Sequence, residues 1–268
     1  MNNLQEACMK GLTDVVRLLL ADSQVNPADK ENLAMRLACR NGHVDVVCLL
    51  LADGRVNPAC DDNLPLHIAC VNGHIDVARL LLADPRINPA DLNNRAMGWA
   101  CTKGHVDVVR LLLADARVDP ACNDNLPLII ACTYGNIDVI RLLLDDTRVN
   151  PADNHNYAIF IASRHNKLDV VRLLLDDTRV NPADNYNQAI CEACKHAHVG
   201  VVRLLLADSR VNPADDHNNA IQLACEHGHI DVVHLLLADN RVNPADNHNH
   251  AIQLACQYGH LDVVFATS

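Results

Sequence analysis

The chain has 268 residues, of which 50% are hydrophobic and only 3% aromatic, and its formal net charge is −11. The apolar share is enough for a long core, which must be built from aliphatic and small side chains because aromatic rings are scarce. The acidic excess argues against nucleic acid or an anionic membrane as the main partner.

A proline recurs every 31 residues along the chain. The series comprises Pro27, Pro58, Pro89, Pro120, Pro151, Pro182, Pro213 and Pro244. A fixed period of this length is typical of a solenoid, in which one small structural unit stacks on copies of itself. We therefore expect residues 1–268 to form a single array of nine repeats, starting near residues 2, 33, 64, 95, 126, 157, 188, 219 and 250.

Each repeat contains two predicted helices, which are clearest in the third repeat. Leu66, Ala69 and Cys70 have the i, i+3, i+4 spacing of a short first helix. Gly73 separates it from a second helix predicted over 75–83, and the proline loop that follows stops that helix. The pattern predicts an all-α fold of stacked helix-turn-helix units.

An asparagine precedes the first helix in every repeat after the first. Its positions are Asn32, Asn63, Asn94, Asn125, Asn156, Asn187, Asn218 and Asn249. Asparagine is a good helix N-cap and tolerates the left-handed conformation, so we expect it in one of these two roles.

Eight of the twelve cysteines also share one position of the repeat. They are Cys8, Cys39, Cys70, Cys101, Cys132, Cys194, Cys225 and Cys256. Stacked helices lie about 8–10 Å apart, whereas a disulfide needs Cα atoms within about 7 Å. We expect unpaired, buried thiols and hence a reducing compartment, the cytosol or the nucleus. The N-terminus shows no signal peptide, and no apolar run is long enough to span a membrane.

Residues 65–74, Pro-Leu-His-Ile-Ala-Cys-Val-Asn-Gly-His, resemble the ankyrin repeat, as do Val232-Val233 and the three leucines at 235–237. The resemblance covers essentially the whole chain and implies an ankyrin-type solenoid whose first and last repeats act as caps. The 31-residue period is shorter than the usual 33 of that family, which predicts short proline-containing finger loops. The resemblance also implies a non-catalytic scaffold that binds another protein through finger tips and the concave face of the first helices.

Two variable positions of the repeat carry histidine and tyrosine from the fifth repeat onward. Their members are Tyr134, His155, His165, Tyr186, His196, His217, His227, His248 and Tyr258. Rings of this amphipathic kind are enriched at interfaces, so we interpret the set as a candidate ridge for contact with a partner protein. A recent duplication of the late repeats would produce the same pattern.

The loop asparagines suggest a second function. Asn57, Asn88, Asn150, Asn181, Asn212 and Asn243 align with the loop asparagine that asparaginyl hydroxylases modify in some ankyrin arrays. Here a proline follows each of them, where that family usually has alanine.

Fifteen histidines raise a third, more remote possibility, which is metal binding. The tightest cluster is Glu192, His196 and His198. Equivalent histidines of successive repeats lie one stacking step apart, which is too far for them to share one zinc ion. His43, His74, His105, His229 and His260, which follow the interhelical glycine, are expected to hydrogen-bond locally between turns.

No catalytic residues and no cofactor are implied, because no glycine-rich phosphate loop and no nucleophile–base set stands apart from the repeat. We expect a monomer that binds an unidentified protein. Trp99, the only tryptophan, is expected to pack into a local groove. Ala197 replaces the interhelical glycine in the seventh repeat, where a left-handed backbone would strain it.

Overall fold

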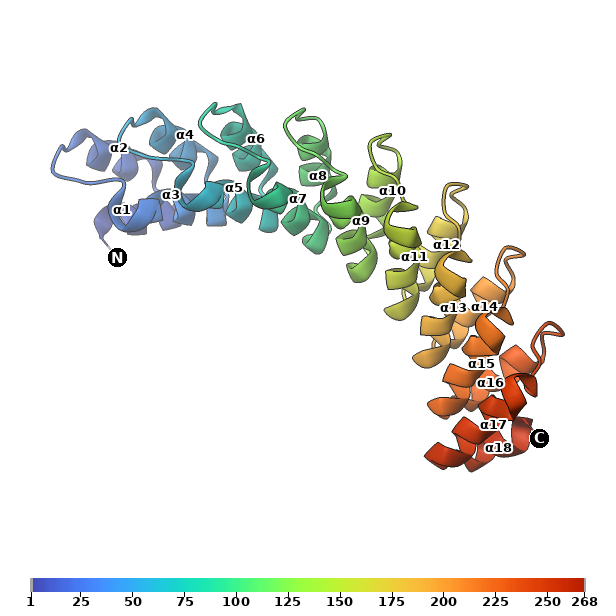
Figure 1. The fold of residues 1–268 in the computed structure, drawn as a ribbon. Coiled ribbons are helices and arrows are strands. Elements are labelled where there is room, and N and C mark those ends of the chain that lie inside the picture. The colour runs from blue at the N-terminus through green and yellow to red at the C-terminus, as the bar shows by residue number, and fades with distance from the viewer. Residues whose placement is uncertain (1, 268) are drawn as a thin grey trace. The chain divides into compact units, whose positions relative to one another are not determined.

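The computed structural model describes residues 2–267, and within this range it contains 18 α-helices and no β-strand (Figure 1). The first nine helices are α1 Asn3–Lys10, α2 Thr13–Ala21, α3 Asp29–Asn41, α4 Val44–Ala52, α5 Cys60–Val71, α6 Ile75–Ala83, α7 Asp91–Lys103, α8 Val106–Leu113 and α9 Cys122–Tyr134. The others are α10 Ile137–Leu144, α11 Asp153–Arg164, α12 Leu168–Leu175, α13 Asp184–Lys195, α14 Val199–Leu206, α15 Asp215–Glu226, α16 Ile230–Leu237, α17 Asp246–Tyr258 and α18 Leu261–Thr267. The predicted all-α class is confirmed.

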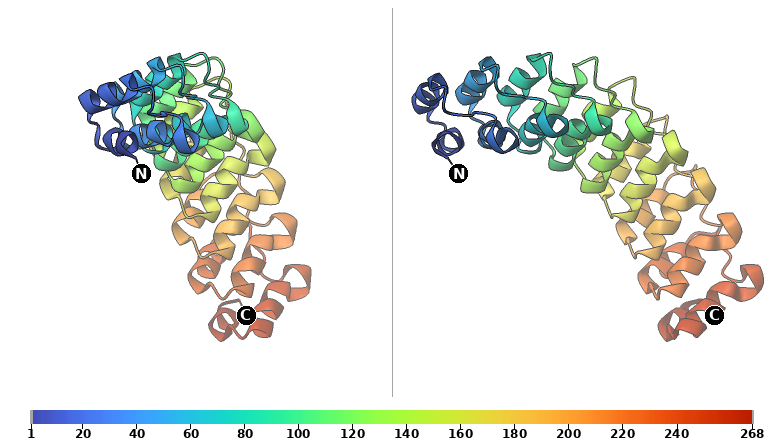
Figure 2. Two further views of the ribbon diagram at one scale, coloured as in Figure 1. Left: turned by 90° about the vertical axis from the view of Figure 1, so that its left-hand side faces the viewer. Right: turned by 60° about the vertical axis from the view of Figure 1, so that its left-hand side comes forward.

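The helices fall into two compact bodies. The N-terminal body comprises Met1–Ala131 with Arg141–Val149, and the C-terminal body comprises Cys132–Ile140 with Asn150–Ser268. In the N-terminal body, α1, α3, α5 and α7 pack side by side in one row, and α2, α4, α6 and α8 form a second row (Figure 2). The C-terminal body repeats this arrangement with α11, α13, α15 and α17 against α12, α14, α16 and α18. No helix within residues 2–267 has the length and apolarity needed to cross a bilayer.

The core of each repeat is the predicted aliphatic and cysteine set. In the third repeat Leu66, Ala69, Cys70, Val77 and Leu81 are all fully buried. As expected, no disulfide joins any of the twelve cysteines, all of which lie within residues 2–267. Those of the shared position are buried as far as Cys225, whereas Cys256 is exposed. Burial raises the pKa of the Cys70 thiol to about 12, so it behaves as a small apolar group rather than as a nucleophile.

Each finger loop ends in a single left-handed turn of three residues. In the third repeat Asp61, Asp62 and Asn63 have φ of 52°, 54° and 59°. The predicted left-handed asparagine is thus confirmed, and it shares this conformation with the two residues before it. The right-handed part of the first helix starts after Asn63, which places Pro65 in its first turn, where a missing N–H costs little.

The interhelical turn uses a left-handed residue as well. Gly73, for example, has φ 74° and follows Asn72, the C-cap of α5. Asn166 and Ala197 take the same conformation in the sixth and seventh repeats, with φ of 54° and 58°. A left-handed alanine is strained because its Cβ crowds the following carbonyl oxygen.

We expect Ala197→Gly to raise the stability of the chain by about 1 kcal/mol, because glycine adopts this conformation without strain. The reciprocal substitution is Gly228→Ala, at φ 71° one repeat later, where an added Cβ would lie 2.5 Å from His260 Nδ1. It should lower stability by at least as much. Thermal unfolding of both variants checks the pair, and a lower melting temperature for Ala197→Gly would contradict it.

Candidate functional site

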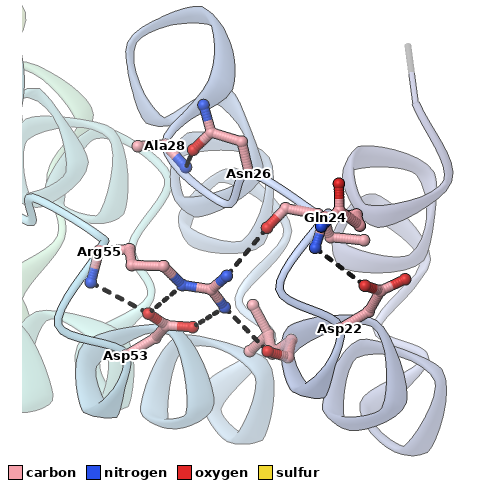
Figure 3. A network of polar contacts seen from close by, with 8 residues as sticks. Asp22, Gln24, Asn26, Ala28, Asp53 and Arg55 are labelled. Carbon is pink, nitrogen blue, oxygen red and sulfur yellow. Dashed lines mark hydrogen bonds and ion pairs between the residues drawn. The ribbon is translucent and has the colours of Figure 1, made fainter.

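Arginine side chains in the finger loops hold each repeat to the one before it (Figure 3). Arg55 pairs with Asp53 at 2.6 Å and also donates to the Leu20 and Val25 carbonyl oxygens at 2.8 and 3.0 Å. Because Leu20 lies in the last turn of α2, the guanidinium satisfies a carbonyl that the helix end leaves unpaired. The hydrogen bonds from Arg55 lower the pKa of Asp53. The same arrangement recurs at Arg86, Arg117, Arg148 and Arg210.

The asparagine before each first helix forms a second link between repeats. Asn187 is buried, and its Oδ1 accepts a hydrogen bond from the Asn212 backbone N–H at 3.0 Å. Its Nδ2 donates to Asp215 Oδ2 at 2.9 Å. Backbone N–H groups bond equivalently to Asn32, Asn63, Asn94, Asn156 and Asn218. The asparagine before each of these first helices therefore joins its repeat to the next one.

Histidines after the interhelical glycine form a third link. His74 Nε2 lies 2.9 Å from the Arg40 carbonyl oxygen of the preceding repeat. The predicted hydrogen bond exists, but it joins neighbouring repeats instead of turns within one repeat. His43, His105, His198, His229 and His260 make the same contact. These histidines have a structural role.

The nine candidate partner-binding residues are all exposed. They form two rows, both within the C-terminal body. The finger row comprises His155, Tyr186, His217 and His248, and the helix-end row comprises Tyr134, His165, His196, His227 and Tyr258. Members of one repeat, such as His155 and His165, lie on either side of the right-handed part of a first helix, residues 157–164, which is about 12 Å long at 1.5 Å per residue. The set therefore lines two edges of the first-helix layer, and its role as a contact ridge for a partner stays a prediction.

The helix-end row is held by local contacts. His196 Nε2 approaches Glu192 Oε2 at 3.4 Å, and His227 Nδ1 lies 3.0 Å from the Leu223 carbonyl oxygen. The imidazole of His196 stacks on that of His198 with ring centroids 5.8 Å apart. One repeat later, the imidazole of His227 stacks likewise on that of His229, with ring centroids 5.9 Å apart. Restrained side chains lose less entropy when they bind, which suits a contact surface.

The cluster around Glu192 does not assemble a metal centre. No group of three or more histidine, cysteine or acidic side chains suited to a metal ion occurs among residues 2–267. His198 directs Nε2 to the Arg164 carbonyl oxygen at 3.0 Å, so only His196 and Glu192 face each other. Two protein ligands fall short of the three or four that zinc sites use.

The loop asparagines are exposed, but their side chains close small turns. Asn57 Oδ1 accepts from the Ala59 N–H at 3.1 Å, across the intervening proline. The same bond forms at Asn88, Asn150, Asn181, Asn212 and Asn243. A modifying enzyme would find these residues accessible, yet it would have to open the turn to extend the loop.

Trp99 departs from the sequence-based expectation. It lies on the outer face of α7, and 38% of its surface is exposed, so it does not fill a groove. The next helix of this row presents Leu126, which is 37% exposed. Large exposed apolar side chains on neighbouring helices are a signature of binding surfaces. The sequence analysis did not single out Trp99 and Leu126 as surface residues, because apolar residues in a helix are normally expected in the core.

Comparison with known proteins agrees with the repeat geometry. The model of the family "Ankyrin repeats (3 copies)" matches residues 4–93, 84–153, 146–215 and 192–266. A comparison with curated proteins finds no match. Four overlapping matches cover almost the whole sequence, and helix pairs with the expected short loops occupy the same residues. The chain therefore belongs to the ankyrin-repeat family.

Proposed function

We propose that the chain is a non-catalytic scaffold that holds another protein, acting as an adaptor, inhibitor or decoy. Ankyrin repeats bind other proteins, and the family is generally non-enzymatic. The proposal includes one uninterrupted array, because the 31-residue period continues unchanged from Pro120 to Pro151, across the boundary between the two bodies. It also includes a monomeric state and a reducing compartment such as the cytosol or nucleus, which fits twelve cysteines that form no disulfide.

One observation carries the proposal: the recurring arginine, asparagine and histidine side chains form hydrogen bonds between repeats, whereas the finger row and the helix-end row remain exposed. Arg86, Asn63 and His74 all bond to a neighbouring repeat. Tyr186, by contrast, is 70% exposed. Tyrosine on a rigid support contributes contact area at low entropic cost.

We expect alanine substitution of the helix-end row at Tyr134, His165, His196 and His227 to weaken partner capture at least about 10-fold. The experiment uses the full chain as bait, identifies captured proteins by mass spectrometry, and measures the affinity of the purified partner for each variant. A variant with alanine at four exposed second-helix arginines, Arg79, Arg110, Arg141 and Arg172, is the control. Equal affinities for both variants, with unchanged circular dichroism, would contradict a role of the row.

A further inference from the structure

The N-terminal body carries an apolar surface of its own on the first-helix layer. We name it the apolar strip; it comprises Leu33, Leu37, Leu64, Ile68, Trp99 and Leu126, on α3, α5, α7 and α9. Residues four apart on one helix lie on the same face. On α5 that face holds Leu64 and Ile68, whereas Leu66 and Cys70 are buried in the core.

The strip continues from Trp99 toward α9, whereas Arg95 interrupts it on α7. Gly98 has no side chain, and a Cβ there would lie only 3.4 Å from Ile130 Cδ1. The α9 side chain thus leans toward α7 beside the indole. Arg95 takes the strip position one turn before Trp99 and is exposed. In the seventh to ninth repeats polar side chains take one or both of the equivalent positions, at Gln188, Glu192, Asn219 and His250, so this surface is less apolar there.

The two edges of the strip differ in charge. The finger edge presents exposed carboxylates at Glu31, Asp61, Asp62 and Asp124. They outnumber the two cations at this edge, Lys30 and Arg36, whose guanidinium donates to the Lys30 carbonyl oxygen at 2.9 Å. The opposite edge, at the ends of the first helices, presents exposed Arg40 and Lys103. A ligand lying along the strip would therefore meet negative charge on one side and positive charge on the other.

The spacing of the strip fits a helix. Neighbouring first helices lie about 10 Å apart. Residues seven apart on an α-helix are separated by about 10.5 Å and share one face. In an extended peptide, residues three apart span about 10 Å but point to opposite sides. Four first helices span about 30 Å, which corresponds to roughly 20 helical residues.

We propose that the apolar strip binds an amphipathic α-helix of the partner protein, with an apolar stripe bordered by basic residues on one edge and acidic residues on the other. This inference rests on the proposed scaffold function and names the chemistry of the partner. Trp99 is the anchor, because a half-exposed indole at the centre of an apolar surface is the commonest kind of binding hot spot. The basic edge of the bound helix faces the finger loops.

A synthetic peptide tests the proposal. It has about 20 residues, with leucine at i, i+3 and i+7, lysine along one edge and glutamate along the other, and no tryptophan. A second peptide has the same composition with the charged edges exchanged. Because Trp99 is the only tryptophan, its emission reports directly on binding to the full chain. We expect a saturable blue shift with the first peptide and at least about 10-fold weaker binding of the second.

Substitutions then locate the contact. Trp99→Ala should weaken binding of a dye-labelled first peptide at least about 10-fold, measured by fluorescence anisotropy. Leu223→Ala, at the equivalent position of the eighth repeat, should leave the affinity unchanged. Equal affinities of the two peptides, no binding of either, or equal effects of the two substitutions would overturn the inference. A partner that is lost from the helix-end variant but retained by Trp99→Ala would uphold the scaffold function while overturning the strip.

Discussion

Asn187→Gly should lower the stability of the chain by about 3 kcal/mol. The substitution removes Oδ1, which accepts a hydrogen bond from the Asn212 backbone N–H at 3.0 Å. It also removes Nδ2, which donates to Asp215 Oδ2 at 2.9 Å. An unsatisfied buried group costs about 1–3 kcal/mol, and hydrogen bonds to charged groups contribute about 1.5–3 kcal/mol. Glycine is chosen because Asn187 has φ 57°, so the substitution adds no backbone strain.

Asn185→Gly is the matched control, because this residue is also left-handed, with φ 50°, but exposed. It should change stability by no more than about 0.5 kcal/mol. Urea unfolding measures both variants. Hydrogen exchange of the Asn212 amide provides a local readout that does not require two-state unfolding of the whole array. Equal stabilities of the two variants, or an unchanged exchange rate at Asn212, would show that this bond does not hold the repeats together.

The stability of the chain should fall as the pH is lowered from 7 to 4, and His67 should account for about 3 kcal/mol of the loss. This residue is only 3% exposed, and no group among residues 2–267 forms a hydrogen bond with its Nε2. Burial lowers its pKa from 6.5 to about 4, helped by the positive charge of Arg95 and opposed by Asp91 and Asp62. Between pH 6.5 and pH 4, His67 binds a proton in the unfolded chain but stays neutral in the folded chain, so lowering the pH favours unfolding.

His67→Phe separates this effect from the other titrating groups. Phe160 occupies the same position of the sixth repeat and is buried there, so the repeat accepts an aromatic hydrocarbon. The variant should lose about 3 kcal/mol less than the parent between pH 7 and pH 4 in urea unfolding. Parallel pH profiles for the two proteins would mean that His67 is protonated in the folded state without penalty.

Much of the fold follows from local rules that the sequence displays. The second helix predicted over 75–83 coincides with α6, because apolar periodicity and a flanking glycine fix both its face and its start. The buried cysteines were predicted from spacing alone, since stacked helices keep equivalent thiols apart. The left-handed state of Asn63 was also expected, because short polar side chains tolerate it.

The bonds between repeats were not predictable from one repeat. Arg55 appears in the sequence as a charged loop residue, and only the stacked loops place it beside the Leu20 carbonyl oxygen. The sequence separates the finger row from the helix-end row by their position in the repeat, but only the fold shows that the two rows lie at different edges of the first-helix layer. The exposure of Trp99 was not predictable either, because burial depends on neighbouring helices, and 38% of the indole surface stays exposed.

The reach of the arginine, asparagine and histidine contacts has a consequence for chain length. Arg117 bonds to carbonyls 30 and 35 residues earlier, and His105 to one 34 residues earlier. Each donor thus recognises only the adjacent repeat and meets the same backbone groups there. Deletion or duplication of a whole 31-residue segment restores every such contact with new partners, whereas a gain or loss of any other length breaks the contacts at that junction. The chain can therefore gain or lose whole repeats, because the arginine, asparagine and histidine hydrogen bonds form again at each new junction.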